Sequence, residues 1–363
     1  MPDGAPYRPE AACGATPPGS APHTPPAEAP RGAAARTLRD AASLVRAGLV
    51  PPQAEAAIAR VAERYAIAIT PAVRALIDPA DPADPIARQY VPDPAELVTA
   101  PWELPDPTAD APHSPVKGVV HRYPDRALLK PLLACPVYCR FCFRREAVGP
   151  GGGVLTEAEL AAALEWFART PAVREAILTG GDPLLLSPRR LGHVLGRLAA
   201  LPHIEILRIH SRVPVADPAR VTPALAQALA IGKPLFLCVH ANHAREFSAA
   251  AAEALQRLAS AGAVLLGQSV LLRGVNDSVE ALEALFRAML RHRVKPYYLH
   301  QLDPAPGTAR FAVPAAEGRA LLAALRGRVS GLAWPTYVQE TPGGGGKVPL
   351  GPAFPEVPLP GDG

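Results

Sequence analysis

Residues 176–211 read AILTGGDPLLLSPRRLGHVLGRLAALPHIEILRIHS, and this stretch sets the architecture. A short apolar run, a longer helical segment and a second apolar run are typical of a strand–helix–strand unit with parallel strands. The same rhythm predicts strands at ALLKPLL (127–133), AILTG (176–180), EILRIHS (205–211), LFLCVHA (235–241), VLLGQSV (264–270), KPYYLHQLD (295–303) and 334–340. Helices are expected near 156–169, 187–200, 222–231, 245–261, 277–292 and 315–328.

The repeating unit predicts an α/β fold with a parallel sheet. Six or so repeats favour a full or partial barrel over a short open sheet, although the repeat by itself does not distinguish the two. In both architectures the functional residues gather at the carboxyl ends of the strands.

Four regions are expected along the chain. Residues 1–35 are rich in Pro and Ala and are expected to be disordered. Residues 36–118 are expected to be helical up to 79 and then irregular, forming an N-terminal helical extension. The barrel is expected over 119–355, followed by a tail at 356–363.

Composition narrows the class of protein. The chain has 363 residues with 49% hydrophobic residues, enough for a sizeable core. Its net charge of +4 comes with no long basic run, which argues against a nucleic-acid partner. No apolar run approaches the roughly 20 residues of a membrane helix, and no secretory signal is visible, so we expect a cytoplasmic protein without membrane contact.

Three of the five cysteines lie in Cys135-Pro-Val-Tyr-Cys139-Arg-Phe-Cys142, directly after the first expected strand. Soft thiolate ligands suit iron–sulfur chemistry, and three of them can bind three irons of a [4Fe–4S] cube, leaving the fourth iron open. A zinc site completed by a histidine is an alternative, and simple packing of three cysteines in eight residues is a weaker one. Cys238, within an expected strand, is interpreted as a core residue, and Cys13 as inert.

The spacing and the aromatic residue before Cys142 resemble the signature of radical S-adenosylmethionine enzymes. Residues 110–355 resemble one branch, the lysine 2,3-aminomutase family. The resemblance rests on HRYPDR (121–126), CPVYCRFCFRR (135–145), TGGDPLLLS (179–187), RIHSRVPV (208–215), QSVLLRGVND (268–277), PYYLHQLD (296–303) and PGGGGKVPL (342–350). It implies a partial (βα)6 barrel, a [4Fe–4S] cluster on Cys135, Cys139 and Cys142, S-adenosylmethionine and pyridoxal 5′-phosphate.

The resemblance also implies roles for individual residues. Lys347, after four glycines, would form the Schiff base with pyridoxal phosphate, a reaction typical of lysine amines. The phosphate of that cofactor would be bound by Arg122 and Arg126, with a polar contact from Gln268. S-adenosylmethionine would contact Gly180, Gly181, Asp182 and His240.

Substrate binding follows from the same resemblance. Arg144 would bind the α-carboxylate of an amino acid, and Asp303 and Glu340 would bind the distant ammonium of lysine. The lysine enzymes have Asp at the position of Glu340 and usually Tyr at the position of His300. The chain also stops soon after the glycine loop, without the cysteine-bearing tail of some relatives, so no structural zinc is expected there.

The implied activity is an isomerase that moves the 2-amino group of L-lysine to carbon 3, giving L-β-lysine. One alternative is the branch that modifies a lysine for elongation factor P, which has a similar YYLH segment but lacks the four-glycine run. A second alternative is a metal-binding protein without turnover. A reductant such as flavodoxin or ferredoxin is expected as a partner, and a homo-oligomer is possible.

Overall fold

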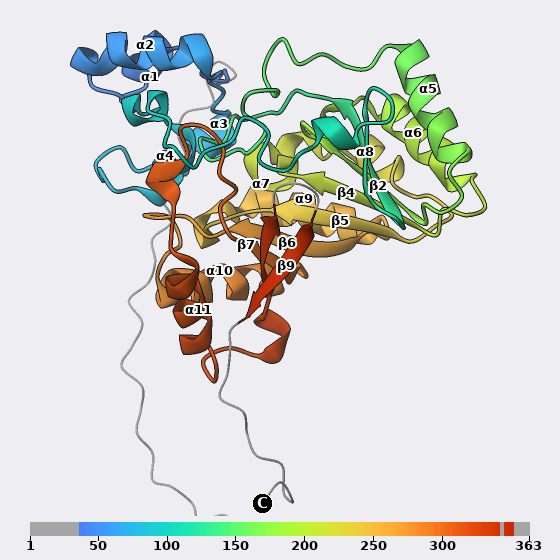
Figure 1. The fold of residues 1–363 in the computed structure, drawn as a ribbon. Helices are drawn as coiled ribbons and strands as arrows, with labels where there is room; N and C mark the ends of the chain where they lie inside the picture. Colours follow the sequence, from blue (N-terminus) through green and yellow to red (C-terminus); the bar gives the residue numbers. More distant parts are fainter. Residues whose placement is uncertain (1–35, 342–344, 352–363) are drawn as a thin grey trace, which may run out of the picture. The chain divides into compact units, whose positions relative to one another are not determined.

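One nine-stranded sheet runs in sequence order from β1 to β9 in the computed structural model, which describes residues 36–341 and 345–351 (Figure 1). Strands β2 to β8 pair in parallel, whereas β1 and β9 pair antiparallel with β2 and β8. The predicted α/β fold with a parallel sheet is therefore confirmed. The strands are β1 (Val119–Tyr123), β2 (Arg126–Leu132), β3 (Glu175–Gly180), β4 (Ile206–Ser211), β5 (Leu235–His240), β6 (Val264–Val270), β7 (Lys295–His300), β8 (Thr336–Thr341) and β9 (Gly346–Gly351).

Helices connect the parallel strands. Four of the long ones begin where a Ser or Thr side chain accepts an N–H from the first turn, at Thr156, Ser187, Ser248 and Ser278. The expected helix at 222–231 is shorter, because its last turn tightens at Ala228 into bonds to Ala224 and Ala226. The helices are α1 (Ala41–Arg46), α2 (Glu55–Arg64), α3 (Pro71–Arg74), α4 (Pro85–Tyr90), α5 (Glu157–Ala168), α6 (Pro188–Ala199), α7 (Val213–Ala216), α8 (Pro223–Gln227), α9 (Ala249–Ser260), α10 (Val279–Arg291) and α11 (Ala315–Ala324).

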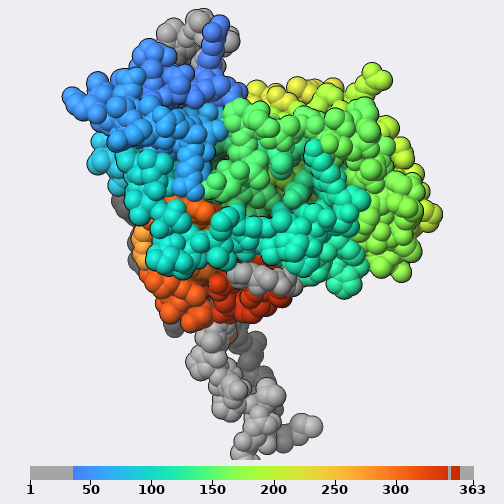
Figure 2. All heavy atoms as spheres, turned by 45° about the horizontal axis from the view of Figure 1, so that its top comes forward, coloured from blue at the N-terminus to red at the C-terminus, as the bar shows by residue number. Residues whose placement is uncertain are grey.

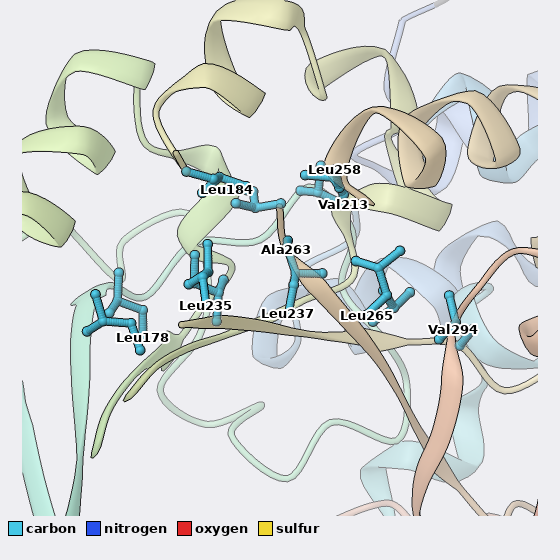
Figure 3. Packing of buried hydrophobic residues seen from close by; sticks show 14 of the residues in the cluster. Leu178, Leu184, Val213, Leu235, Leu237, Leu258, Ala263, Leu265 and Val294 are labelled. Carbon is cyan, nitrogen blue, oxygen red and sulfur yellow. The ribbon is translucent and has the colours of Figure 1, made fainter. Parts of the chain in front are cut away.

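The main core lies between the sheet and these helices. Leu235 and Leu237 of β5 and Leu265 of β6 point toward Leu258 of α9 and Val213 of α7 (Figure 3). Side chains alternate along a strand, so every second residue of β5 is left on the opposite face. The sequence did not predict the two antiparallel strands, β1 and β9. HRYPDR and the residues after the glycines carry too few apolar residues to mark a strand.

The N-terminal region forms a second core. Leu44, Ile58, Ile69 and Ile86 are fully or almost fully buried there, and Val137 of the cysteine loop packs into the same cluster. Helices α1 to α4 (blue to cyan) lie against the green segment that follows β2 (Figure 2). The region that precedes the sheet is therefore part of the support of the cysteine loop.

Two expected regions, 1–35 and 356–363, fall outside the described residues, as does Cys13. Among the helices that the structure describes, none is long and apolar enough to cross a membrane.

Candidate active site

A cavity of about 460 Å³ lies along the face of the sheet opposite the long helices and extends to the carboxyl ends of the parallel strands. Its walls come from strands β1 to β7, the cysteine loop, and the β8–β9 pair. All the site residues expected from the sequence line this cavity: Arg122, Arg126, Cys135, Cys139, Cys142, Arg144, Gly180, Gly181, Asp182, His240, Gln268, Asp303, Glu340 and Lys347. The fold thus brings together groups that are more than two hundred residues apart in the chain.

Strand alternation decides which side chains reach the cavity. On β5, Leu235, Leu237 and Val239 face the helices, whereas Cys238 and His240 face the cavity. Cys238 is buried, as expected of a core residue, but it belongs to the cavity wall rather than to the core cluster.

The three cysteines of the loop after β2 are partly buried and free. Burial raises the pKa of the Cys139 thiol to about 11, and it also raises the pKa of Cys135 and Cys142. A bound metal cation would favour the thiolate form that ligates it. No group of three His, Cys, Asp or Glu side chains within the described residues is arranged around one metal ion. A cubic cluster does not need one, because each thiolate binds a different iron.

Gly180 and Gly181 allow the backbone before Cys135 to approach β3 closely. Gly180 has a φ of +105°, and a Cβ on Gly181 would lie 2.2 Å from the carbonyl oxygen of Ala134. The Gly181 N–H donates to Leu132 (2.8 Å) and the next N–H to Ala134 (2.9 Å). The glycine pair therefore positions the cysteine loop, and these two N–H groups are not available to a ligand.

Asp182 uses its carboxylate inside the protein. One oxygen accepts from Ser211 Oγ (2.8 Å) and the Leu184 N–H, and the other accepts from the N–H groups of Arg212 (2.7 Å) and Val213. These bonds tie the end of β3 to the end of β4. A direct contact between this carboxylate and S-adenosylmethionine stays a prediction.

Lys347 lies on strand β9, whereas the sequence predicted that it would lie on a loop. The β8–β9 register places it opposite Glu340, and its Nζ is 2.7 Å from Glu340 Oε2. The other oxygen of Glu340 accepts from Arg122. The Lys347 N–H donates to the Tyr123 hydroxyl (2.8 Å), and the Arg126 guanidinium lies 3.7 Å from the centre of the Tyr123 ring. The register of β9 against β8 therefore sets the position of Lys347.

Asp110 was not singled out from the sequence, because it lies in the irregular proline-rich stretch. Its carboxylate accepts from Arg144 Nε (3.0 Å), Lys130 Nζ (3.2 Å) and Arg122 Nη2 (3.4 Å). Burial disfavours the ionised form, but Arg144 and Lys130 lower the pKa of this carboxyl well below its usual value. Asp110 is therefore a buried anion that organises three cations.

Asp303 has the opposite surroundings. Its carboxylate has no hydrogen-bond or ion-pair partner among the described residues. Burial and the neighbouring Glu340 raise its pKa to about 7. The cavity also holds three histidines, His210, His240 and His300, whose buried Nε2 atoms have no partner. Burial lowers the pKa of His300 to about 3, and it lowers the others well below their usual value, so the three imidazoles are neutral.

A buried network from the N-terminal region holds the cysteine loop. Glu96 follows α4 in the short helix η2 (Pro94–Leu97) and accepts from Arg140 (2.6 Å) and Arg145. Arg140 also donates its backbone N–H to Gln89 of α4 (2.8 Å). Sequence reasoning missed this network because its members are far apart and follow no local pattern.

Gln89 also reaches the cavity wall through Arg212. The Arg212 guanidinium donates to Gln89 (2.7 Å), Tyr90 (2.6 Å) and Glu246 (2.7 Å), while its Nη1 is buried without a partner. The helix α4 therefore joins the cysteine loop to the end of β4.

Comparisons with known proteins show the family of this chain. The family model "Radical SAM superfamily" matches residues 129–287, and the model "Lysine-2,3-aminomutase" matches residues 322–355. The L-lysine 2,3-aminomutase of Clostridium subterminale is 41% identical over 83% of this chain and 72% of its own length. The chain belongs to the lysine 2,3-aminomutase family.

Other members of the family are similar over most of the chain. The L-lysine 2,3-aminomutase of Escherichia coli is 41% identical over 74% of this chain and 79% of its own length. The glutamate 2,3-aminomutase of Clostridioides difficile is 34% identical over 82% of this chain and 70% of its own length.

Family membership implies a [4Fe–4S] cluster, S-adenosylmethionine and pyridoxal phosphate. The donor set fits these groups, since one cavity holds three free thiols, unpartnered imidazole nitrogens, several arginines and a lysine amine. The two family models divide the cavity accordingly, because the cysteines fall in the first match and Lys347 in the second.

Proposed function

We propose that this chain converts L-lysine to L-β-lysine by moving the 2-amino group to carbon 3. The observation that supports this most is that two groups of opposite charge with free hydrogen-bonding atoms line one cavity. Arg144 presents a guanidinium whose terminal nitrogens have no partner among the described residues, and Asp303 presents a carboxylate without one. A basic amino acid has the matching charges, an α-carboxylate and a distant ammonium.

The charge at the end of the substrate side chain distinguishes lysine from glutamate. Burial and the neighbouring carboxylate of Glu340 raise the pKa of Asp303, so negative charge already accumulates at this end of the cavity when both ionise. A second substrate carboxylate would be repelled there, whereas an ammonium relieves the repulsion.

The remaining residues are assigned by their place on the cavity. We assign the cluster to Cys135, Cys139 and Cys142, and S-adenosylmethionine to the side of Gly180, Gly181, Asp182 and His240. We assign pyridoxal phosphate to Lys347, with Arg122, Arg126 and Gln268 around its phosphate. When bound, the cluster and S-adenosylmethionine supply radical chemistry, and pyridoxal phosphate supplies a π-system that stabilises an unpaired electron. The protein orients the substrate and excludes water.

Product analysis tests the proposal. The protein is reconstituted anaerobically with iron, sulfide and pyridoxal phosphate, reduced, and incubated with S-adenosylmethionine and either L-lysine or L-glutamate. We expect β-lysine from lysine and no product from glutamate. Lys347→Ala should abolish the product, whereas Lys117→Ala, which removes an exposed lysine paired with Glu159, should retain it. No β-lysine from a cluster-loaded wild type would refute the proposal.

The second candidate function is that of the branch that modifies a lysine for elongation factor P. His300 at the end of β7, where the lysine enzymes usually have Tyr, favours it. The same assay is run with elongation factor P and free lysine side by side. Turnover only when that factor is present would favour this candidate over free lysine.

A further inference from the structure

We propose that Asp110 is a positioning residue that fixes the Arg144 guanidinium so that its two terminal nitrogens receive the α-carboxylate of the substrate. The inference rests on the proposed function, which assigns the carboxylate to Arg144. Nothing in the comparisons assigns a role to Asp110.

The carboxylate of Asp110 accepts hydrogen bonds from other side chains and not from the N–H groups of a helix end. It precedes the short helix η3 (Ala111–His113), but its side chain makes no cap there. Its Oδ2 accepts from Arg144 and Lys130, and its Oδ1 accepts from Thr108 Oγ1 (3.2 Å) and Arg122. Its own position is braced, because its backbone N–H donates to Asp106 (3.0 Å). Asp110 is thus a fixed anion with a fixed direction.

Arg144 is held on one edge and left open on the other. The Nε–H of Arg144 donates to Asp110 Oδ2 (3.0 Å), and the guanidinium carbon lies 4.4 Å from the centre of the Phe143 ring. Nη1 and Nη2 have no partner among the described residues. A carboxylate binds an arginine best through two parallel N–H groups, and these two form such a fork. Asp110 therefore occupies the edge that the substrate does not need.

A second cavity explains why this fixing matters. A cavity of about 240 Å³ adjoins the first, and Phe143 and Arg144 line both. Its wall also contains the acidic residues Asp106 and Glu146, so Arg144 has alternative anions on that side. Asp110 lies in the wall of this second cavity as well. Without its carboxylate the guanidinium could turn toward Asp106 or Glu146, and the fork would no longer be fixed toward the reaction cavity.

Asp110 also links Arg144 to Lys347. Alternating charges run from Lys347 to Glu340, Arg122, Asp110 and Arg144, each in an ion pair with the next. An α-amino acid carries its amine and its carboxylate on one carbon, so the two anchors must keep a set separation. The ion-pair series supplies that separation from this chain's own residues.

Binding measurements on the holoenzyme without S-adenosylmethionine test the inference, since no turnover occurs. L-lysine is compared with 1,5-diaminopentane, which is lysine without its carboxylate. In Asp110→Asn we expect the Kd for lysine to rise about tenfold, the effect of losing one charge-assisted contact, while the Kd for the diamine stays unchanged. Asp277→Asn, which affects an ion pair with exposed Arg273, is the matched control and should change neither value.

A double-mutant cycle separates positioning from general structure. In an Arg144→Met background, Asp110→Asn should no longer change lysine affinity, because the group through which it acts is gone. If Asp110→Asn fails to fold, Asp110→Glu keeps the charge, and its smaller rise in the lysine Kd should vanish in the same background. An equal rise for lysine and the diamine, or an effect that persists without Arg144, would overturn the inference alone. A wild type that does not bind lysine would overturn the proposed function as well.

Discussion

Glu340 and Lys347 stand opposite each other on β8 and β9, with Glu340 Oε2 2.7 Å from Lys347 Nζ. The strand register sets this contact. It places the one amine expected to react beside an anion that already pairs with Arg122. The lysine, the phosphate-binding cation expected from the sequence and the ammonium-binding carboxylate therefore form one connected group rather than three separate subsites.

Glu340→Gln should weaken the fold, because Arg122 and Lys347 lose a shared anion. The Arg122 side chain is only 8% exposed, so its guanidinium cannot turn to water instead. We expect the free energy of unfolding to fall by about 1–3 kcal/mol, measured by urea denaturation. Glu205→Gln removes an exposed partner of Arg174 and should change stability by less than about 0.5 kcal/mol. Equal effects of the two variants would contradict the importance of the buried group.

Lysine affinity should rise with pH through about 7, the pKa of Asp303. Its pKa is raised, so the carboxyl is neutral below that pH and anionic above it, and only the anion attracts the substrate ammonium. The apparent KM for lysine should therefore fall as the pH increases across this range. Asp303→Asn should raise the KM and flatten this dependence. A pH profile of KM that is unchanged in the variant would show that another group titrates.

Gly181→Ala should damage the cluster site. The new Cβ would meet the Ala134 carbonyl oxygen at 2.2 Å and must displace the backbone that leads into Cys135. We expect less iron and sulfide bound per chain after anaerobic reconstitution. Gly196→Ala, in α6 with nothing within 4 Å of its Cβ, is the control and should be neutral or stabilising by up to about 1 kcal/mol. Full iron content in Gly181→Ala would refute the proposed packing constraint.

Glu96→Gln tests the support that the N-terminal region gives to the cysteine loop. Burial raises the pKa of Glu96, but Arg140 and Arg145 outweigh it and lower the pKa, so the carboxylate is ionised. Removing this negative charge leaves buried arginines without their ion pair, so the free energy of unfolding should fall by about 3–5 kcal/mol. Iron binding should fall with it. Glu146→Gln, on a partly exposed pair with Arg64 beside the same loop, should cost less than about 1 kcal/mol. The idea fails if iron content stays at the wild-type level in a folded Glu96→Gln protein.

The sequence by itself predicted the parallel sheet and a set of residues that the fold brings to one cavity. Apolar runs of strand length, separated by helical segments, indicate strands that are buried in a sheet covered by helices. This pattern can be recognised from neighbouring residues alone. The residues at the ends of those runs, such as His240 at the end of β5 and Asp303 after β7, had to meet at one edge because parallel strands end on the same side. The cysteine motif is equally local, because its three cysteines lie within eight residues of one loop.

Only the tertiary structure decided how these residues are held. Asp110 meets Arg144 across 34 residues, Glu96 meets Arg140 across 44, and Arg122 meets Glu340 across 218. None of these carboxylates lies in a periodic pattern, so their sequence surroundings resemble those of exposed acids. Their role comes from burial beside arginines of other elements, where an ionised group is stable only when it is paired. Likewise, the position of Lys347 opposite Glu340 follows from the register of β9 against β8. The two residues are only seven positions apart, but β9 carries too few apolar residues for the sequence to mark it as a strand.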